Sequence, residues 1–251
     1  MADTVSIIVP ALNERENLEN LISRLKNQSL NSIYIIDDNS NDGTPELEAE
    51  FPDVHFLYRS SRLGLISAEI DGMRLTDSNY VVIMDADLSH SPEDIRGMLA
   101  QAIETGSDLV VGSRYTGSGE NNDELVRKVI SRTANMLFKI SFGITVKDCT
   151  SGFRVYSRKA CNYLGRQVDL ENGYVGQVDI VNRLTHNNFK ITEYPVKFIK
   201  RTEGKSKLKM REIVNFFLFI IYNKKIFRPI LGASMIIIFF VAISFILVLL
   251  I

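Results

Sequence analysis

The sequence of 251 residues has no tryptophan, only two cysteines and almost no net charge. Cys149 and Cys161 form neither a disulfide framework nor a cysteine-based metal-binding pattern. The formal net charge of −1 gives no indication of a nucleic-acid partner. The N-terminus lacks the basic and then apolar segments of a signal peptide. Apolar residues make up 45% of the chain, which is ample for one large domain or for one domain with an appendage.

Short apolar runs alternate with helical patterns through the first half of the chain. Strands are expected at residues 5–9, 32–37, 54–60, 80–85 and 108–115. Helices are expected after Asn13 as an N-cap, and at residues 45–51, 66–75 and 92–104. This alternation predicts an α/β fold in which a mostly parallel sheet is flanked by helices on both faces.

Polar residues follow most of the predicted strands. They are residues 10–14 after the first strand, Asp37 and Asp38 after the second, Asp85 and Asp87 after the fourth, and Ser113 and Arg114 after the fifth. In such sheets, ligands bind outside the carboxyl ends of the parallel strands. We therefore expect these polar residues to line a single cleft along one edge of the sheet.

Two acids one residue apart end the buried run YVVIM: Asp85 and Asp87, with Ala86 between them. Their carboxylates could converge on one hard divalent cation, Mg²⁺ or Mn²⁺, which commonly bridges a substrate diphosphate. Without a cation, two close anions would repel each other and raise a pKa. The structural alternative is that Asp85 ends the strand and Asp87 begins a turn.

The C-terminal segment 229–251 contains no charged residue and is long enough to cross a ~30 Å hydrocarbon core. Lys224, Lys225 and Arg228 precede it, so the positive-inside rule places the preceding domain on the cytoplasmic side. Residues 211–225 fit either an interfacial helix or an ordinary core helix. The expected division is a globular domain at 1–210, an interfacial and basic segment at 211–228, and a transmembrane helix at 229–251, as a single anchor or the first of several spans.

Several segments resemble the family 2 glycosyltransferases, which have a Rossmann-like GT-A fold: SIIVPALNE, IIDDNSNDGT, MDADLSHSP and GSRY. Others are similar to the dolichol-phosphate mannose synthases of this family: DADLSHSP, DCTSGFRVYSR, ENGYVGQVDI and KRTEGKSKL. The resemblance implies a metal-dependent membrane enzyme with Mg²⁺ or Mn²⁺ as cofactor. It also implies inverting transfer of mannose from GDP-mannose to a dolichyl or polyprenyl phosphate, which gives a lipid-phosphate mannose.

The resemblance assigns residues to the nucleotide-sugar donor and to the metal. The donor-binding residues are Pro10, Leu12, Glu14, Asp38, Asp85, Ala86, Asp87, Gln177, Arg201 and Lys207, and the metal ligands are Asp85, Asp87 and Ser89. Leu12 departs from the family, which often has an aromatic residue there, and Ser89 stands where a glutamine is common. His90 is expected to be a hydrogen-bonded structural imidazole in preference to a metal ligand or base. Glu14 and Asp38 could instead serve as a helix cap and a turn residue.

The acceptor decides which further residues the chemistry needs. A sugar hydroxyl requires a general base, whereas a lipid phosphate is already anionic and requires positive charge around it. Arg114 follows a strand, and Arg132 and Asn135 lie one helical turn apart. The resemblance places the acceptor phosphate at these three residues, and the catalytic residues are Asp87, Arg114 and Arg132. Arg132 could otherwise lie on a solvated helix face.

Two further segments complete the expected site. Residues 200–209 are a basic cluster that could close over a diphosphate or bind anionic lipid. Residues 148–157 match the family segment between donor and acceptor. There, Asp148 could position the sugar or orient an arginine, and Ser151 and Gly152 let the backbone approach the ligand.

Three other functions remain open at this stage. The donor could be UDP-glucose or another UDP-sugar, with the same lipid phosphate as acceptor. The protein could be a non-catalytic membrane adaptor that binds a nucleotide sugar, although intact Asp85, Asp87, Arg114 and Arg132 argue against this. A hydroxyl-directed polysaccharide synthase is disfavoured, because the chain lacks a QxxRW-like motif and has no tryptophan.

Overall fold

The computed structural model describes residues 3–28, 32–121, 131–133, 135–136, 138–139, 142–167, 170 and 173–199. The predicted interfacial segment 211–228 and apolar segment 229–251 lie outside these residues, as do Arg201 and Lys207. Within the described ranges, no helix is both long enough and apolar enough to span a membrane.

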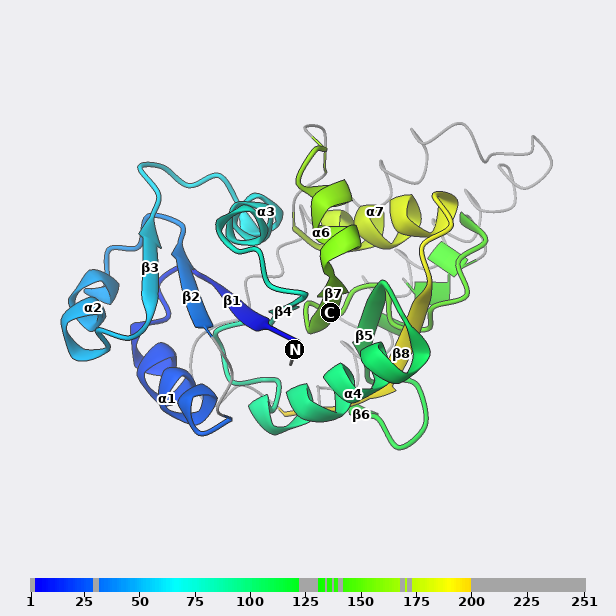
Figure 1. Cartoon of the computed structure of the whole chain (residues 1–251), viewed down its shortest axis with the longest axis horizontal. Coiled ribbons are helices and arrows are strands. Elements are labelled where there is room, and N and C mark those ends of the chain that lie inside the picture. Colours follow the sequence, from blue (N-terminus) through cyan, green and yellow to red (C-terminus); the bar gives the residue numbers. More distant parts are fainter. Residues whose placement is uncertain are drawn as a thin grey trace, which may run out of the picture.

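A seven-stranded sheet forms the centre of the domain (Figure 1). Its strands are β1 (Val5–Ala11), β2 (Ser32–Asp37), β3 (His55–Tyr58), β4 (Tyr80–Ile83), β5 (Leu109–Ser113), β7 (Arg154–Ser157) and β8 (Ile191–Pro195). Their order is β3-β2-β1-β4-β7-β5-β8, and only β7 runs antiparallel to its neighbours. A second small sheet pairs β6 (Glu120–Asn121) with β9 (Lys197–Phe198).

Helices cover both faces of the sheet. They are α1 (Arg15–Lys26), α2 (Leu47–Glu50) after the 3-10 turn Thr44–Glu46, α3 (Leu65–Leu75), α4 (Ile95–Thr105) after the 3-10 turn Pro92–Asp94, α6 (Arg158–Leu164) and α7 (Gly173–His186). Helices α1, α2 and α4 share one core cluster, and α3, α6 and α7 share the other. The described residues between 131 and 142 are also helical and contribute Phe138 and Phe142 to the second cluster.

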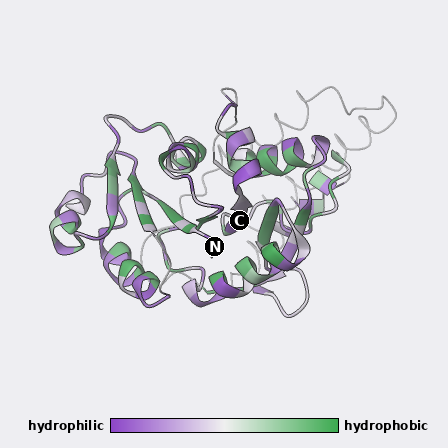
Figure 2. Ribbon diagram, in the orientation of Figure 1, coloured by the Kyte–Doolittle hydropathy of each residue, from purple (hydrophilic) through white to green (hydrophobic). Residues whose placement is uncertain are grey.

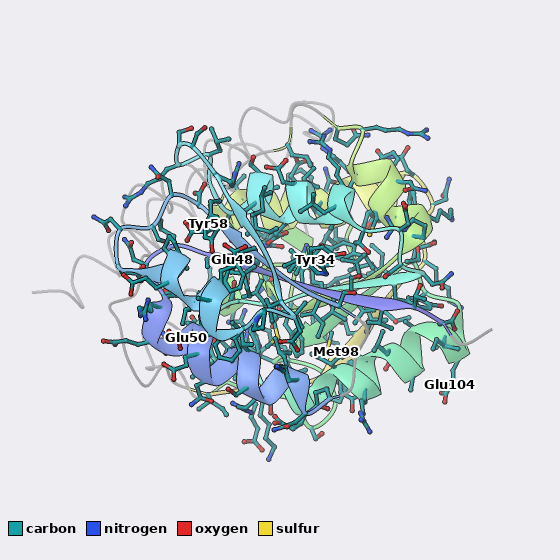
Figure 3. All side chains as sticks on the ribbon, turned by 60° about the vertical axis from the view of Figure 1, so that its left-hand side comes forward. Tyr34, Glu48, Glu50, Tyr58, Met98 and Glu104 are labelled. Atoms are coloured by element: carbon teal, nitrogen blue, oxygen red, sulfur yellow. The ribbon has the colours of Figure 1, made fainter. Side chains whose placement is uncertain are left out.

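The central strand β1 shows why the sheet must be covered on both sides. All seven of its residues are buried: Ile7 and Val9 face the α1 and α4 cluster, whereas Ile8 faces the α3 and α7 cluster. Figure 2 shows hydrophobic residues along the central strands and hydrophilic residues on the outer turns of the helices. In Figure 3, Met98 of α4 lies toward the sheet and Glu104, at the far end of the helix, lies at the outer surface.

The predicted strands and helices of residues 5–113 are confirmed, with shifts of a few residues at their ends. The predicted helix cap at Asn13 is wrong, because Glu14 is the N-cap and Asn13 adopts a left-handed conformation with φ 52°. The Oδ1 atom of Asn13 instead accepts a hydrogen bond from the backbone amide of Asn41 at 2.9 Å. A contact between two loops thus replaces the local cap.

The topology creates a binding crevice beside β1. From β1 the chain continues outward on one side through β2 and β3, whereas β4 pairs with the opposite edge of β1. Such a switch in strand order leaves a crevice outside the carboxyl ends of the two central strands. The residues that follow β1 and β4 therefore lie on either side of this crevice.

Candidate active site

The loop after β4 holds the two acids at the crevice. Asp85 follows the strand and its side chain is 34% exposed, whereas Asp87 is buried. The Oδ1 atom of Asp87 accepts hydrogen bonds from the Ser89 backbone amide at 3.0 Å and from the Ser89 hydroxyl at 2.5 Å. Ser89 therefore fixes the orientation of the Asp87 carboxylate.

Gly152 lies directly against Asp85. A Cβ atom at residue 152 would stand 3.1 Å and 3.2 Å from the two carboxylate oxygens of Asp85, closer than ordinary van der Waals contact. The segment after Asp148 thus reaches the crevice, and only glycine leaves Asp85 its present position. This close approach agrees with the role expected for Gly152, which was to let the backbone come near the ligand.

The donor atoms in this loop fit a hard divalent cation. Carboxylate oxygens are the ligands that Mg²⁺ and Mn²⁺ prefer, and the partly exposed Asp85 is accessible from the crevice. Among the residues that the structure describes, no three His, Cys, Asp or Glu side chains form a metal-binding cluster. A cation held by Asp85 and Asp87 could take further ligands from Ser89, a diphosphate and water.

His90 lies in the wall of the site. It is buried, its Nε2 atom lies 3.9 Å from Asp85 Oδ2, and its ring packs 5.1 Å from Phe153 and 5.4 Å from Phe198, measured between ring centroids. The backbone amide of Ile199 donates to Ser89 O at 2.9 Å, so the end of β9 is bonded to the same loop. The imidazole therefore packs between two aromatic rings beside Asp85.

The residues expected to bind the nucleotide lie at the ends of β1 and β2. Pro10 is buried within β1, and Leu12 is partly exposed just beyond it. Glu14 caps α1, and its carboxylate accepts a hydrogen bond from Asn17 at 2.8 Å. The buried carboxylate of Asp38 accepts from the backbone amides of Leu63 and Gly64, both at 2.9 Å. Asp38 thereby ties the loop that precedes α3 to the end of β2.

Arg114 is held in place by a buried acid. Its Nε and Nη2 atoms donate to the two oxygens of Asp148 at 2.8 Å and 2.7 Å, and its backbone amide donates to Asp148 Oδ2 at 2.9 Å. Burial alone would raise the pKa of Asp148, but the Arg114 guanidinium lowers that pKa below its usual value. Of the two roles expected for Asp148, the structure shows that it orients an arginine.

Arg132 and Asn135 occupy different positions on one helical segment. Arg132 is exposed, and its guanidinium lies 5.6 Å from the centroid of the Tyr115 ring. Asn135 is buried; its Oδ1 accepts from the Cys149 backbone amide at 2.8 Å and its Nδ2 donates to Ser131 O at 3.0 Å. The asparagine thus anchors the segment that carries Asp148, whereas Arg132 faces outward.

An open pocket of about 400 Å³ lies beside Arg132. It is lined by Tyr115, Arg132, Asn135, Met136, Lys139 and Lys147. Three of these described lining residues are cations and none is a carboxylate. Lys139 and Lys147 were not among the expected site residues, although Lys139 follows Arg132 and Asn135 at helical spacing.

Gln177 and Cys149 lie behind the crevice. Gln177 of α7 is 2% exposed, and its Nε2 atom donates to Glu69 of α3 at 2.5 Å. Its side chain is thus engaged within the protein, and its expected place in the donor site stays a prediction. Burial raises the pKa of the Cys149 thiol to about 12, so this side chain is not a thiolate nucleophile at neutral pH.

A mostly parallel sheet with acids beyond β4 and a crevice at its switch point is the arrangement of a GT-A glycosyltransferase, the fold that solved structures share with this chain. The chain belongs to glycosyl transferase family 2, whose sequence profile matches residues 6–165. It is 35% identical over 212 residues to the polyprenol monophosphomannose synthase of Mycolicibacterium smegmatis, covering 80% of each chain. It is 37% identical over 223 residues to the dolichol-phosphate mannosyltransferase of Pyrococcus furiosus, covering 84% of this chain and 61% of that protein.

Solved structures agree on the fold. Glucosyl-3-phosphoglycerate synthase from Mycobacterium tuberculosis, in complex with Mn²⁺, UDP and glucosyl-3-phosphoglycerate, superposes with a TM-score of 0.67 and 18% identity, covering 88% of this chain and 78% of that one. The same enzyme with Mg²⁺ and UDP gives a TM-score of 0.70 and 16% identity, covering 91% and 82%. At these identities the likeness shows the fold alone.

Proposed function

We propose that the protein transfers mannose from GDP-mannose to the phosphate of a dolichyl or polyprenyl lipid, with inversion at the anomeric carbon. Two relatives at 35% and 37% identity, named a polyprenol monophosphomannose synthase and a dolichol-phosphate mannosyltransferase, support this activity. The observation that carries it is the pocket lined by Arg132. Its described lining offers three cations and no carboxylate base.

A phosphate acceptor needs this kind of pocket. Its oxygen is anionic near neutral pH and can attack without losing a proton, so no general base is required. In the transfer step, a phosphate oxygen forms a bond to the anomeric carbon while the bond from that carbon to the GDP oxygen breaks. Arg132 would orient the attacking phosphate, and Arg114, fixed by Asp148, would present its charge beside it.

The other side of the crevice would hold the donor. Asp85 and Asp87 would ligate Mg²⁺ or Mn²⁺, which when bound neutralises charge on the departing diphosphate. Glu14 would accept hydrogen bonds from the nucleotide, with Pro10, Leu12 and Ala86 beside it. Asp38 would act by placing the loop that ends at Gly64. Solved GT-A relatives hold Mn²⁺ or Mg²⁺ together with UDP, which supports a cation at this position.

The remaining assignments concern residues outside the described part of the chain. Arg201 and Lys207 would close over the diphosphate. Residues 211–228 would lie on the membrane and residues 229–251 within it, with domain 1–210 on the cytoplasmic side. This arrangement would bring the crevice to the depth at which a lipid phosphate emerges from the bilayer.

A labelled-donor assay tests the proposal. Purified full-length protein is mixed with a polyprenyl phosphate, Mn²⁺, GDP-mannose carrying a ¹³C-labelled sugar and unlabelled UDP-glucose, and the lipid product is measured by mass spectrometry. We expect lipid phosphate that carries one labelled hexose. An unlabelled product would replace GDP-mannose with UDP-glucose as the donor. No lipid-linked sugar with either donor would favour a non-catalytic binding protein.

A further inference from the structure

A fully buried arginine organises the centre of the site. Arg154 of β7 is 0% exposed, and its guanidinium donates to three backbone carbonyls: Ser151 O at 2.7 Å, Cys149 O at 2.8 Å and Gln177 O at 2.9 Å. It also donates to the Tyr156 hydroxyl at 3.2 Å. Because a buried charge is costly unless it is fully hydrogen-bonded, these bonds constrain the backbone around Arg154. Arg154 therefore connects the turn at 149–151 to helix α7.

Glu69 of α3 meets this network through Gln177. It is 1% exposed, and its Oε1 atom accepts the 2.5 Å hydrogen bond from Gln177 Nε2. Within the described part of the chain, Glu69 Oε2 and Gln177 Oε1 are buried and neither has a hydrogen-bond partner. A carboxylate and an amide oxygen can only accept, so an ionised Glu69 leaves two buried acceptors without a donor. A protonated Glu69 would add one O–H donor to the same pair of side chains.

The surroundings of Glu69 favour its protonated form. Burial raises the pKa of Glu69 to about 8; Arg154 opposes this rise, Asp85 adds to it, and the Gln177 hydrogen bond opposes it. Tyr156 also lies in this environment, and burial raises its pKa, so it stays neutral. Arg154 and Asp85 are thus the charged groups that act on Glu69, and the net effect keeps its carboxyl neutral at pH 7.

The segment that Arg154 holds touches both halves of the active site. At one end, Asp148 fixes Arg114 through the 2.7 Å bond to its guanidinium. At the other end, Gly152 lies against the carboxylate of Asp85. Residues 148–152 therefore act as a spacer between the side chains that would hold the leaving diphosphate and the arginine that would face the acceptor phosphate.

We propose that Glu69 is a positioning residue for the transfer reaction: paired with Gln177, it secures the Arg154 network that sets the distance between Asp85 and Arg114. The inference rests on the proposed function, because the two halves of the site are defined by it. A displacement of about 1 Å between reacting groups can cost about 10²-fold in rate, so a packing residue outside the crevice can act on kcat.

Two substitutions separate this role from general stability. Glu69→Leu removes the acceptor of Gln177 Nε2 and leaves that donor buried, whereas Glu69→Gln keeps an acceptor oxygen and supplies an N–H donor. We expect Glu69→Leu to lower kcat about tenfold or more, with KM for GDP-mannose and for lipid phosphate within about twofold of the wild type. Glu69→Gln should restore kcat to within about threefold. Leu21→Ala in α1, on the other face of the sheet, serves as a destabilised control with an unchanged kcat.

Two kinetic results would overturn the proposal. One is an unchanged kcat in Glu69→Leu protein that is folded, as judged by circular dichroism. The other is a loss of kcat in Leu21→Ala equal to that in Glu69→Leu, because the effect would then report stability alone.

A second measurement needs no substrate. Since the pKa of Glu69 is raised in the folded protein above its ordinary 4.5, the stability that goes with its neutral form is present below that value and is lost as the pH rises through about 8. The free energy of unfolding of the wild type should therefore fall, relative to Glu69→Gln, between pH 5 and pH 9. Equal pH dependence in the two proteins would overturn the pairing itself. Absence of any lipid-linked mannose from the wild type would instead contradict the proposed function.

Discussion

The two parts of the site that we propose for the donor and for the acceptor are built in different ways. On the donor side, Asp38 and Asp87 are buried, and backbone amides of adjoining loops bond to their carboxylates. On the acceptor side, Arg132, Lys139 and Lys147 are exposed around an open pocket. The donor side is preorganised by hydrogen bonds to the backbone, whereas the acceptor side presents exposed cationic side chains on a solvated surface.

The difference matches what each substrate requires. A departing diphosphate develops charge in the transition state, and preorganised groups stabilise such charge best. A lipid phosphate must enter and leave while its chain stays in the membrane, so its site has to be open on one side. Arg114 connects the two regions: Asp148 holds its guanidinium through hydrogen bonds at 2.8 Å and 2.7 Å, and that guanidinium lies 5.4 Å from the ring centroid of Tyr115, which lines the pocket. We therefore expect substitutions on the donor side to lower kcat, and substitutions on the acceptor side to raise KM for the lipid phosphate.

The largest effect is expected at Asp87. Asp87→Ala removes one of the two carboxylates that would hold the cation and diphosphate, and kcat should fall by about 10³-fold or more. The measurement is initial rate with saturating donor and lipid phosphate across a range of Mn²⁺ concentrations. Asp77→Ala, at an exposed acid before β4, is the matched control and should keep its activity. Retained activity in Asp87→Ala would contradict the proposal that Asp85 and Asp87 hold a divalent cation.

A smaller effect on a different parameter is expected at Arg132. Arg132→Ala should raise KM for the lipid phosphate about 10- to 100-fold, because a charge-assisted hydrogen bond to phosphate is lost. KM for GDP-mannose should not change. Arg96→Ala, at an exposed arginine of α4, controls for the loss of one positive charge. A large rise in KM for GDP-mannose in Arg132→Ala would place Arg132 on the donor side and contradict its assignment to the acceptor phosphate.

Gly152 tests the contact between the two sides. Gly152→Ala puts a Cβ atom 3.1 Å from an Asp85 carboxylate oxygen, so Asp85 has to move. We expect kcat to fall about tenfold and the Mn²⁺ concentration for half-maximal rate to rise, with little change in thermal stability. Normal Mn²⁺ dependence in this variant would mean that Asp85 tolerates the displacement and does not hold the cation.

The smallest effects are expected at Lys139 and Lys147. Both are exposed, and solvent screens their charges, so Lys139→Gln and Lys147→Gln should each raise KM for lipid phosphate only about two- to fivefold. The effect should shrink as salt is added, since the attraction is electrostatic. Lys159→Gln in α6 removes an exposed lysine elsewhere and should have no effect on this KM. Equal effects from all three substitutions would indicate a general response to charge and not a lysine-lined acceptor site.

Much of the fold could be predicted from local patterns. The runs that became β1, β2, β4 and β5 are short and rich in β-branched residues, and the acids that follow β4 indicated the crevice. The antiparallel strand β7 was not foreseen, because the sequence of Arg154–Ser157 does not reveal which strands it joins. Partners 34 residues apart, such as Arg114 and Asp148, depend on that topology.

Candidate site residues could be proposed from the sequence where a local pattern suggests a ligand, as with paired acids after a strand. Residues whose side chains make hydrogen bonds inside the protein could not be recognised in this way. Asp85 and Asp87 indicated a cation through their spacing together with their place after an apolar strand, and this site stays a prediction. Asn135 and Gln177 were assigned to ligands by resemblance; both make hydrogen bonds within the protein, and Asn135 also lines the pocket beside Arg132. The role of Glu69 could not be predicted from the sequence, because a glutamate in a helix is usually exposed to solvent. Glu69 is buried only because α3 packs against α7.

The most direct test of the central claim is the formation of lipid-linked mannose from GDP-mannose and polyprenyl phosphate, with and without a chelator of divalent cations. The account predicts a product whose anomeric configuration is opposite to that of the donor, its loss when chelator is added, and its return when Mn²⁺ is restored. Transfer that continues unchanged in chelator, or a product that retains the donor configuration, would contradict it.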